Sequence, residues 1–265
     1  MKQGLFCLLL IWISTAATAE KFIVGSQNIE YYPHYNFSSP IDKGVGWAIL
    51  EAFSEASGHE FSYLTMPIRR LQMEMLKGHV DFVYPDNPGW YNDVTKTKEK
   101  YFSIALTRAV TGTFVKPKNV NKGISSIKRI AMPLGFTPVN WQTRLDQNLI
   151  KIVSISDTFA GLSLLQLERV DAIDFEYHVG NYYTSQSPQI GPFILDITLP
   201  HNEIPFMLSA LRHQEVIEEL NAFINNNPAI IDSIRSRYGI TSLEALTQQI
   251  QTEFSIEDKD IWQPQ

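Results

Sequence analysis

The sequence predicts an α/β fold divided into two lobes, and three observations support that prediction. Apolar runs typical of strands alternate with helical patterns, as in parallel strands joined by helical crossovers. The pattern then restarts, because LQLERVDAI at residues 165–173 resembles MLKGHVDFV at residues 75–83. A length of 265 residues also suits two units, since one domain takes roughly 150 residues.

The first half of the chain is expected to hold three strands separated by two helices. The strands are short apolar runs, and the helices repeat apolar side chains every three or four residues. Gly58 and Gly78 follow the two helical patterns, where C-terminal caps belong. In chain order, the elements are expected at residues 22–25, 46–56, 61–64, 67–77 and 80–84.

The second half repeats this order and ends in helices. Two polar stretches, residues 116–123 and residues 199–205, are expected to carry the chain between the lobes. The tail, residues 255–265, is polar and is expected to fray. Strands are expected at residues 110–115, 130–132 and 150–155, and helices at residues 141–145, 159–165, 216–224 and 230–238.

Composition excludes several function classes. The net charge is −6 and no run of basic residues occurs, which argues against nucleic acid or an anionic membrane as a partner. The single cysteine, Cys7, excludes disulfide frameworks, thiolate zinc sites and a cysteine nucleophile. The six histidines lack metal-binding spacing, and no glycine-rich phosphate loop or nucleophile elbow is present. We therefore expect neither a metal nor a cofactor.

The N-terminus predicts an export signal over residues 1–19. Lys2 supplies a positive charge, residues 5–13 are apolar, and residues 17–19 read Ala-Thr-Ala, the small-residue pattern before a cleavage site. The apolar run is shorter than the roughly 20 residues that span a bilayer. We therefore expect an exported chain that begins near Glu20 and is not inserted in a membrane.

Aromatic side chains gather in loops that follow predicted strands. Ligands of open α/β sheets collect at the carboxyl ends of strands, so these loops are candidates for a binding surface. Tyrosine and tryptophan combine a flat apolar face with a polar group, which suits a small polar organic ligand, although each ring also suits packing between lobes. The residues are Tyr31, Tyr32, Tyr35, Tyr84, Trp90, Tyr91, Phe136 and Trp141.

Two acidic residues, Asp174 and Glu176, alternate on a predicted strand. Side chains two positions apart on a strand point to the same face, so we expect the two carboxylates to lie together. Two interpretations follow. The pair either forms a solvated edge or lies at the mouth of a cleft, where it would receive a cationic group.

Short motifs along the whole exported chain occur in a distinctive order. Each motif is degenerate, but together they resemble family 3 of the periplasmic solute-binding proteins, the amino-acid-binding type that serves ABC transporters. The motifs lie at residues 22–25, 31–33, 44–53, 67–70, 76–81, 101–103, 135–137, 169–172, 219–221 and 237–239.

The resemblance implies a two-lobed periplasmic-binding-protein-like fold of type II, with two hinge crossovers. Residues 20–115 and 205–265 would form the first lobe, and residues 118–199 the second. Ligand would bind between lobes that close around it.

The resemblance also implies positions for the site. Glu30 and Tyr31 would lie in the first binding loop, and Tyr84, Asp86 and Asn87 in the second. In the second lobe, Phe136 and Thr137 would lie where the family offers hydrogen-bond donors. Glu176 would receive an α-amino group. The expected ligand-binding residues are Glu30, Tyr31, Arg70, Tyr84, Asp86, Asn87, Trp90, Arg108, Phe136, Thr137 and Glu176.

One departure from the family concerns carboxylate recognition. The arginine that binds the ligand carboxylate in typical members would fall near Thr111, where this chain has none. A bidentate guanidinium is hard to replace in this role. Arg108 or Arg70 is the candidate replacement, although Arg70 also suits a solvated helix end.

The expected function is capture of a small polar metabolite, an amino acid or an amine-like relative, in the periplasm for ABC-type import. Such a protein would act as a monomer, perform no chemistry, and meet a permease or a membrane sensor. One alternative is a sensory or accessory binding protein outside transport. Another is a dehydratase or lyase on the same scaffold, with acid and base drawn from Glu30, Asp86, Asp174 and Glu176; a strongly raised carboxylate pKa in the cleft would favour it.

Overall fold

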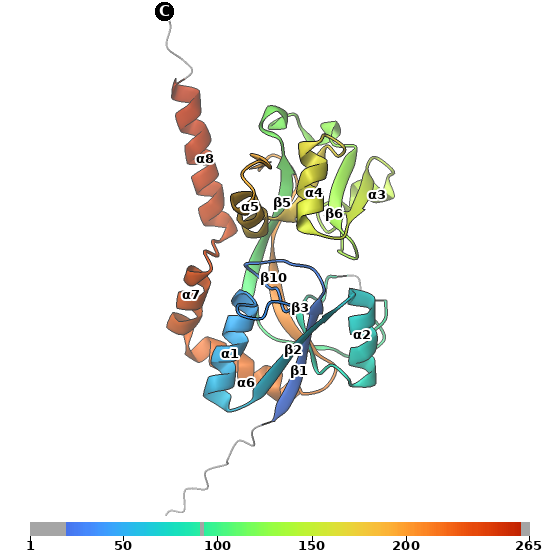
Figure 1. Cartoon of the computed structure of the whole chain (residues 1–265), viewed down its shortest axis with the longest axis vertical. Helices are drawn as coiled ribbons and strands as arrows, with labels where there is room; N and C mark the ends of the chain where they lie inside the picture. The colour runs from blue at the N-terminus through green and yellow to red at the C-terminus, as the bar shows by residue number, and fades with distance from the viewer. Residues whose placement is uncertain (1–19, 91–92, 261–265) are drawn as a thin grey trace, which may run out of the picture.

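The computed structural model describes residues 20–90 and 93–260 of the chain, and Tyr91 and the export signal predicted for residues 1–19 lie outside them. The described strands join a ten-stranded sheet in the order β2-β1-β3-β10-β5-β8-β6-β7, with β4 paired to β10 and β9 paired to β5. Figure 1 shows two lobes stacked along the long axis, joined by β5 and β10. No helix in the described part of the chain is both long and apolar enough to cross a membrane.

The lower lobe of Figure 1 is built on three parallel strands, with β1 between β2 and β3. Helix α1 buries Ile49, Leu50 and Phe53, the stripe expected from its spacing, and left-handed glycines end both α1 and α2. The elements are β1 (Lys21–Gln27), α1 (Val45–Ser57), β2 (Glu60–Met66), α2 (Ile68–Lys77), β3 (Phe82–Asp86) and β4 (Tyr101–Phe102).

The upper lobe repeats the plan, with β6 between the parallel strands β7 and β8. Its elements are the 3-10 turns η1 (Pro117–Asn119) and η2 (Ile124–Ser126), β6 (Arg129–Pro133), α3 (Gln142–Asp146), β7 (Lys151–Ile155), α4 (Thr158–Gln166), β8 (Ala172–Glu176), α5 (Tyr177–Gln186) and β9 (Ile194–Leu195).

The repeated Val-Asp motif has the same structural role in both lobes. The Asp81 carboxylate accepts a hydrogen bond from the backbone N–H of Ile23, 2.8 Å away, while the Asp81 N–H donates to the Ile23 carbonyl. Asp171 makes the same reciprocal pair with Arg129, at 2.7 and 2.8 Å. The motif therefore ties the start of each lobe's third strand to its first, which explains its recurrence in the sequence.

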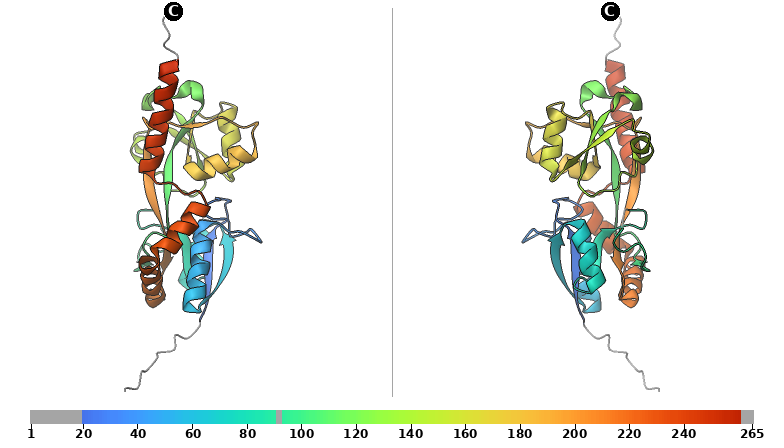
Figure 2. Two further views of the ribbon diagram at one scale, coloured as in Figure 1. Left: turned by 90° about the vertical axis from the view of Figure 1, so that its left-hand side faces the viewer. Right: turned by 90° about the vertical axis from the view of Figure 1, so that its right-hand side faces the viewer.

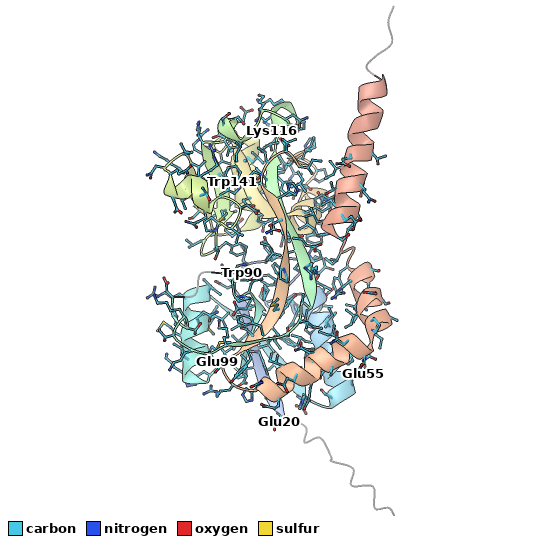
Figure 3. The ribbon with its side chains drawn as sticks, turned by 180° about the vertical axis from the view of Figure 1, so that it is seen from behind. Glu20, Glu55, Trp90, Glu99, Lys116 and Trp141 are labelled. Carbon is cyan, nitrogen blue, oxygen red and sulfur yellow. The ribbon has the colours of Figure 1, made fainter. Side chains whose placement is uncertain are left out.

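Two antiparallel strands, β5 (Thr107–Val115) and β10 (His201–Ala210), join the lobes. They pair with each other from His201 opposite Gly112 to Phe206 opposite Thr107. Beyond this stretch β5 pairs with β8 of the upper lobe, and β10 pairs with β3 of the lower lobe. The crossing expected at residues 116–123 is wrong: these residues follow β5, and Lys116 lies at the far end of the upper lobe (Figure 3). The polar composition of residues 116–123 indicates turns, whereas the chain crosses between the lobes in strand β5.

Three helices complete the chain: α6 (Gln214–Asn226), α7 (Pro228–Arg237) and α8 (Leu243–Asp260). Helices α6 and α7 lie on the lower lobe, whereas α8 runs alongside the upper lobe (Figures 1 and 2). Leu246 and Ile250 of α8 are buried. We expected residues 205–265 to belong to the first lobe, whereas α8 lies along the upper lobe. We also expected the chain to fray from residue 255, whereas the backbone is helical through Asp260.

Candidate functional site

A cavity lies between the lobes, at the carboxyl ends of strands from each lobe. Gln27 ends β1, Asp86 ends β3, and Gly135 follows β6; all three line the cavity. Its volume is about 80 Å³, counted as space for the centres of water molecules, which accommodates roughly five to eight waters. Both lobes therefore turn their strand ends toward one enclosed space, the position where α/β sheets bind ligands.

Aromatic side chains from both lobes form much of the cavity wall. The Tyr31 ring from the lower lobe lies 5.5 Å from Phe136 and 5.3 Å from Phe175 of the upper lobe, both edge to face. Trp90, seen where the lower lobe faces the upper one in Figure 3, lies 5.6 Å from Phe206 of β10. Tyr31, Trp90 and Phe136, expected in the site, all line this cavity.

Asp86 lines the cavity, but its charge is already compensated. Its carboxylate accepts hydrogen bonds from Lys100 Nζ at 2.7 Å and Ser209 Oγ at 2.6 Å. Lys100 Nζ also donates to Gln72 Oε1 at 3.1 Å. Asp86 is 4% exposed and the Lys100 side chain 7%, so the pair is buried in the lower lobe's wall. The sequence analysis missed Lys100, because nothing in the chain pattern links it to Asp86.

Asp174 of β8 lines the cavity from the upper lobe and is 8% exposed. Burial raises the pKa of Asp174 to about 7, and the hydrogen bond from Asn140 offsets this only in part. That bond, from Asn140 Nδ2, is long at 3.5 Å, and the same amide donates to Thr111 Oγ1 at 3.3 Å. Among the described residues, no lysine, arginine or histidine forms an ion pair with Asp174.

Glu176, the expected receptor for an amino group, does not line the cavity. It is fully buried, accepts a hydrogen bond from His178 Nδ1 at 2.7 Å, and lies 3.1 Å from His34 Nε2. The backbone N–H groups of Val110 and Val179 also donate to it. Burial alone would raise the pKa of Glu176, but His34 and His178 lower it well below its usual range. Glu176 ends β8 and caps α5, so its side chain turns into the protein instead of following Asp174.

Four of the other expected residues stand apart from the cavity. Tyr84 is buried in the lower lobe, and Asn87 donates to the Pro205 carbonyl at 2.9 Å. Arg70 is exposed on α2. Arg108 has a side chain that is 58% exposed and lies 3.5 Å from Glu203.

The remaining expectations concern Thr137, Glu30 and Trp141. Thr137 lines the cavity beside Phe136. Glu30 does not line it and instead bridges the lobes: its carbonyl accepts from Thr158 Oγ1 at 3.2 Å and its carboxylate from Tyr183 at 3.4 Å. Trp141 is fully buried in the upper lobe.

Contacts between the lobes surround the cavity. Gln27 Nε2 from the lower lobe donates to the Leu134 carbonyl of the upper lobe at 2.9 Å. The Tyr32 and Tyr182 rings meet at a centroid distance of 4.6 Å. With the Glu30 contacts, these interactions hold the two lobes together in a closed arrangement.

Proteins of known structure share this architecture. The GluR0 ligand-binding core in complex with L-glutamate has a TM-score of 0.66 and 16% identity, covering 84% of this chain and 99% of its own. An ancestral arginine-binding protein bound to arginine has a TM-score of 0.65 and 17% identity, covering 82% and 97%. An arginine third-transport-system periplasmic binding protein from Legionella pneumophila has a TM-score of 0.63 and 15% identity, covering 83% and 100%. The chain matches no protein-family model and no curated protein.

At this level of identity the likeness establishes the fold. The predicted α/β, two-lobed fold of the periplasmic-binding-protein type is confirmed, and its structural neighbours are amino-acid-binding proteins. One neighbour is the substrate-binding protein of an amino acid ABC transporter. The chain thus shares its fold with proteins whose structures were determined in complex with L-glutamate or arginine.

Proposed function

We propose that this chain is a periplasmic solute-binding protein that captures a small polar metabolite, an amino acid or an amine-like relative, for ABC-type import. The observation that carries the proposal is the interlobe cavity, enclosed by both lobes and lined by rings, amides and carboxylates. An arginine-binding neighbour and the substrate-binding protein of an amino acid ABC transporter support it. So does the predicted export signal at residues 1–19.

In this proposal the protein works by closure and performs no chemistry. The lobes open and close about β5 and β10, and a ligand that touches both lobes shifts the population toward the closed form. Tyr31 and Asp86 would contact the ligand from the lower lobe, and Phe136, Thr137 and Asp174 from the upper lobe. The closed monomer is what a permease would recognise.

A variant that fills the cavity tests the proposal. The chain is screened by thermal melting against amino acids, amines, small peptides and organic acids. A ligand at 100 times its Kd adds about 2.7 kcal/mol, a shift on the order of 5–10 °C for this size. Thr137→Trp occupies the cavity and should abolish the shift. Thr143→Trp, exposed on α3, should retain it.

The readout separates two failures. A folded wild-type chain that no compound stabilises would count against a solute-binding function. A ligand that stabilises Thr137→Trp as much as wild type would place binding outside the cavity.

A second function is favoured by one observation, the raised pKa of Asp174. A buried carboxyl that titrates near pH 7 suits a general acid or base, as in a dehydratase or lyase. The other cavity carboxylate, Asp86, is held by Lys100 and Ser209, which leaves it a poor partner in proton transfer. An incubation with any compound that stabilises the chain, followed by product analysis, distinguishes the two functions. Conversion of the compound supports the enzyme, and an unchanged compound supports binding alone.

A further inference from the structure

The charged side chains that line the cavity are acidic. Among the described residues that line it, Asp86 and Asp174 are the charged ones, and neither lysine nor arginine is present. Asp86 lies 2.7 Å from Lys100 Nζ, so this pair is close to neutral. The uncompensated charge that the cavity presents to a ligand is therefore that of Asp174.

Asp174 is a buried acidic group that has no cationic partner among the described residues. More than nine-tenths of the residue is buried, yet the hydrogen bond it receives from Asn140 is 3.5 Å long. A buried carboxylate without a counter-charge is costly, and a cation placed beside it recovers that cost. Glu176, two residues further on, shows the contrast, because His178 and two backbone amides donate hydrogen bonds to it and His34 Nε2 lies 3.1 Å away.

Aromatic rings complete the surroundings of a cation in this cavity. Tyr31 packs edge to face against Phe175, the residue after Asp174, and against Phe136. Aromatic faces attract organic cations, most strongly where water is excluded. The same ring faces repel an anionic group.

The described lining of the cavity offers no cationic group to pair with a ligand carboxylate. Arg108 lies beside Glu203 with its side chain largely exposed, and Arg70 is exposed on α2; neither lines the cavity. A carboxylate would instead meet the uncompensated carboxylate of Asp174, at an energetic cost. We infer that the ligand is a small organic ammonium ion that carries no carboxylate, held by Asp174 and the surrounding rings. This inference rests on the proposed solute-binding function.

Matched ligand pairs test the inference. Binding of the exported chain is measured by calorimetry with agmatine and arginine, putrescine and ornithine, and phenethylamine and phenylalanine, each amine differing from its amino acid by the carboxylate alone. At least one amine should bind tenfold or more tightly than its amino acid. Asp174→Asn, which keeps the shape and removes the charge, should weaken that amine at least tenfold. Asp146→Asn, an exposed carboxylate on α3, should leave the affinity within twofold.

Each contrary result has a distinct meaning. An amino acid that binds as tightly as its amine, or an organic acid that binds instead, overturns the inferred ligand class and leaves the solute-binding function intact. An amine whose affinity survives Asp174→Asn overturns the assigned receptor and with it the inference. A folded chain that binds no compound of the broader screen overturns both the inference and the function on which it rests.

Discussion

Two carboxyl groups on one strand, Asp174 and Glu176, have opposite electrostatic surroundings. Asp174 faces a cavity, and burial raises its pKa to about 7. Glu176 faces His34 and His178, which lower its pKa well below the usual range despite burial. The first is arranged to gain from a bound cation, whereas the second is a structural anchor between the loop of His34 and α5.

The sequence predicted this pair only in part. Strand alternation correctly placed both residues on one strand and raised the possibility of a cation receptor, which fits Asp174. The family resemblance assigned the amino-group role to Glu176, because nothing local reveals that the strand ends there and that His34 approaches its carboxylate. Contacts between residues so far apart in the chain carry no periodic signal.

The raised pKa of Asp174 predicts a pH-dependent stability. The unfolded-state pKa is about 3.9 and the folded value about 7, so ionisation opposes folding increasingly between these pH values and fully above pH 7. Asp174→Asn removes that cost and should stabilise the ligand-free chain by roughly 2–4 kcal/mol at pH 8, and by nothing near pH 4. Urea unfolding at pH 4, 6 and 8 measures the difference. A gain of equal size at all three would mean that ionisation is not its cause.

At the scale of elements, the two lobes share one construction. In each, an aspartate before the third strand makes a reciprocal pair with the backbone of the first, Asp81 with Ile23 and Asp171 with Arg129. The strands and helices flanking this motif were predictable because their apolar spacing is local. The expected strand at residues 110–115 and crossing at residues 199–205 overlap the hinge strands β5 and β10. The full extent of these strands and the docking of α8 were not predicted, since both depend on contacts with distant segments.

The motif itself can be tested at Asp171. Asp171→Ala leaves the N–H groups of Lys128 and Arg129 without their acceptor and should lower the free energy of unfolding by about 1–2 kcal/mol. The control Asp146→Ala, which loses one exposed contact to Gln142, should cost less than about 0.5 kcal/mol. Denaturant titration of both variants provides the comparison. Equal losses would show that the Asp171 pair has no special role.

At the scale of the whole molecule, the lobes meet around the cavity through hydrogen bonds, aromatic contacts and the buried contact between His34 and Glu176. Gln27 with Leu134, and Glu30 with Thr158 and Tyr183, are individual hydrogen bonds, each worth about 1 kcal/mol net. A ligand that touches both lobes would add to these contacts and so favour the closed state.

The most direct test of the account is small-angle X-ray scattering of residues 20–265, alone and with a saturating amount of the amine that binds most tightly. The account predicts a larger radius of gyration for the free chain and contraction on binding, with the bound curve matching the closed arrangement in Figure 1. Asp174→Asn should not contract at the same amine concentration. Identical curves for the free and bound wild-type chain would contradict capture by closure between the lobes.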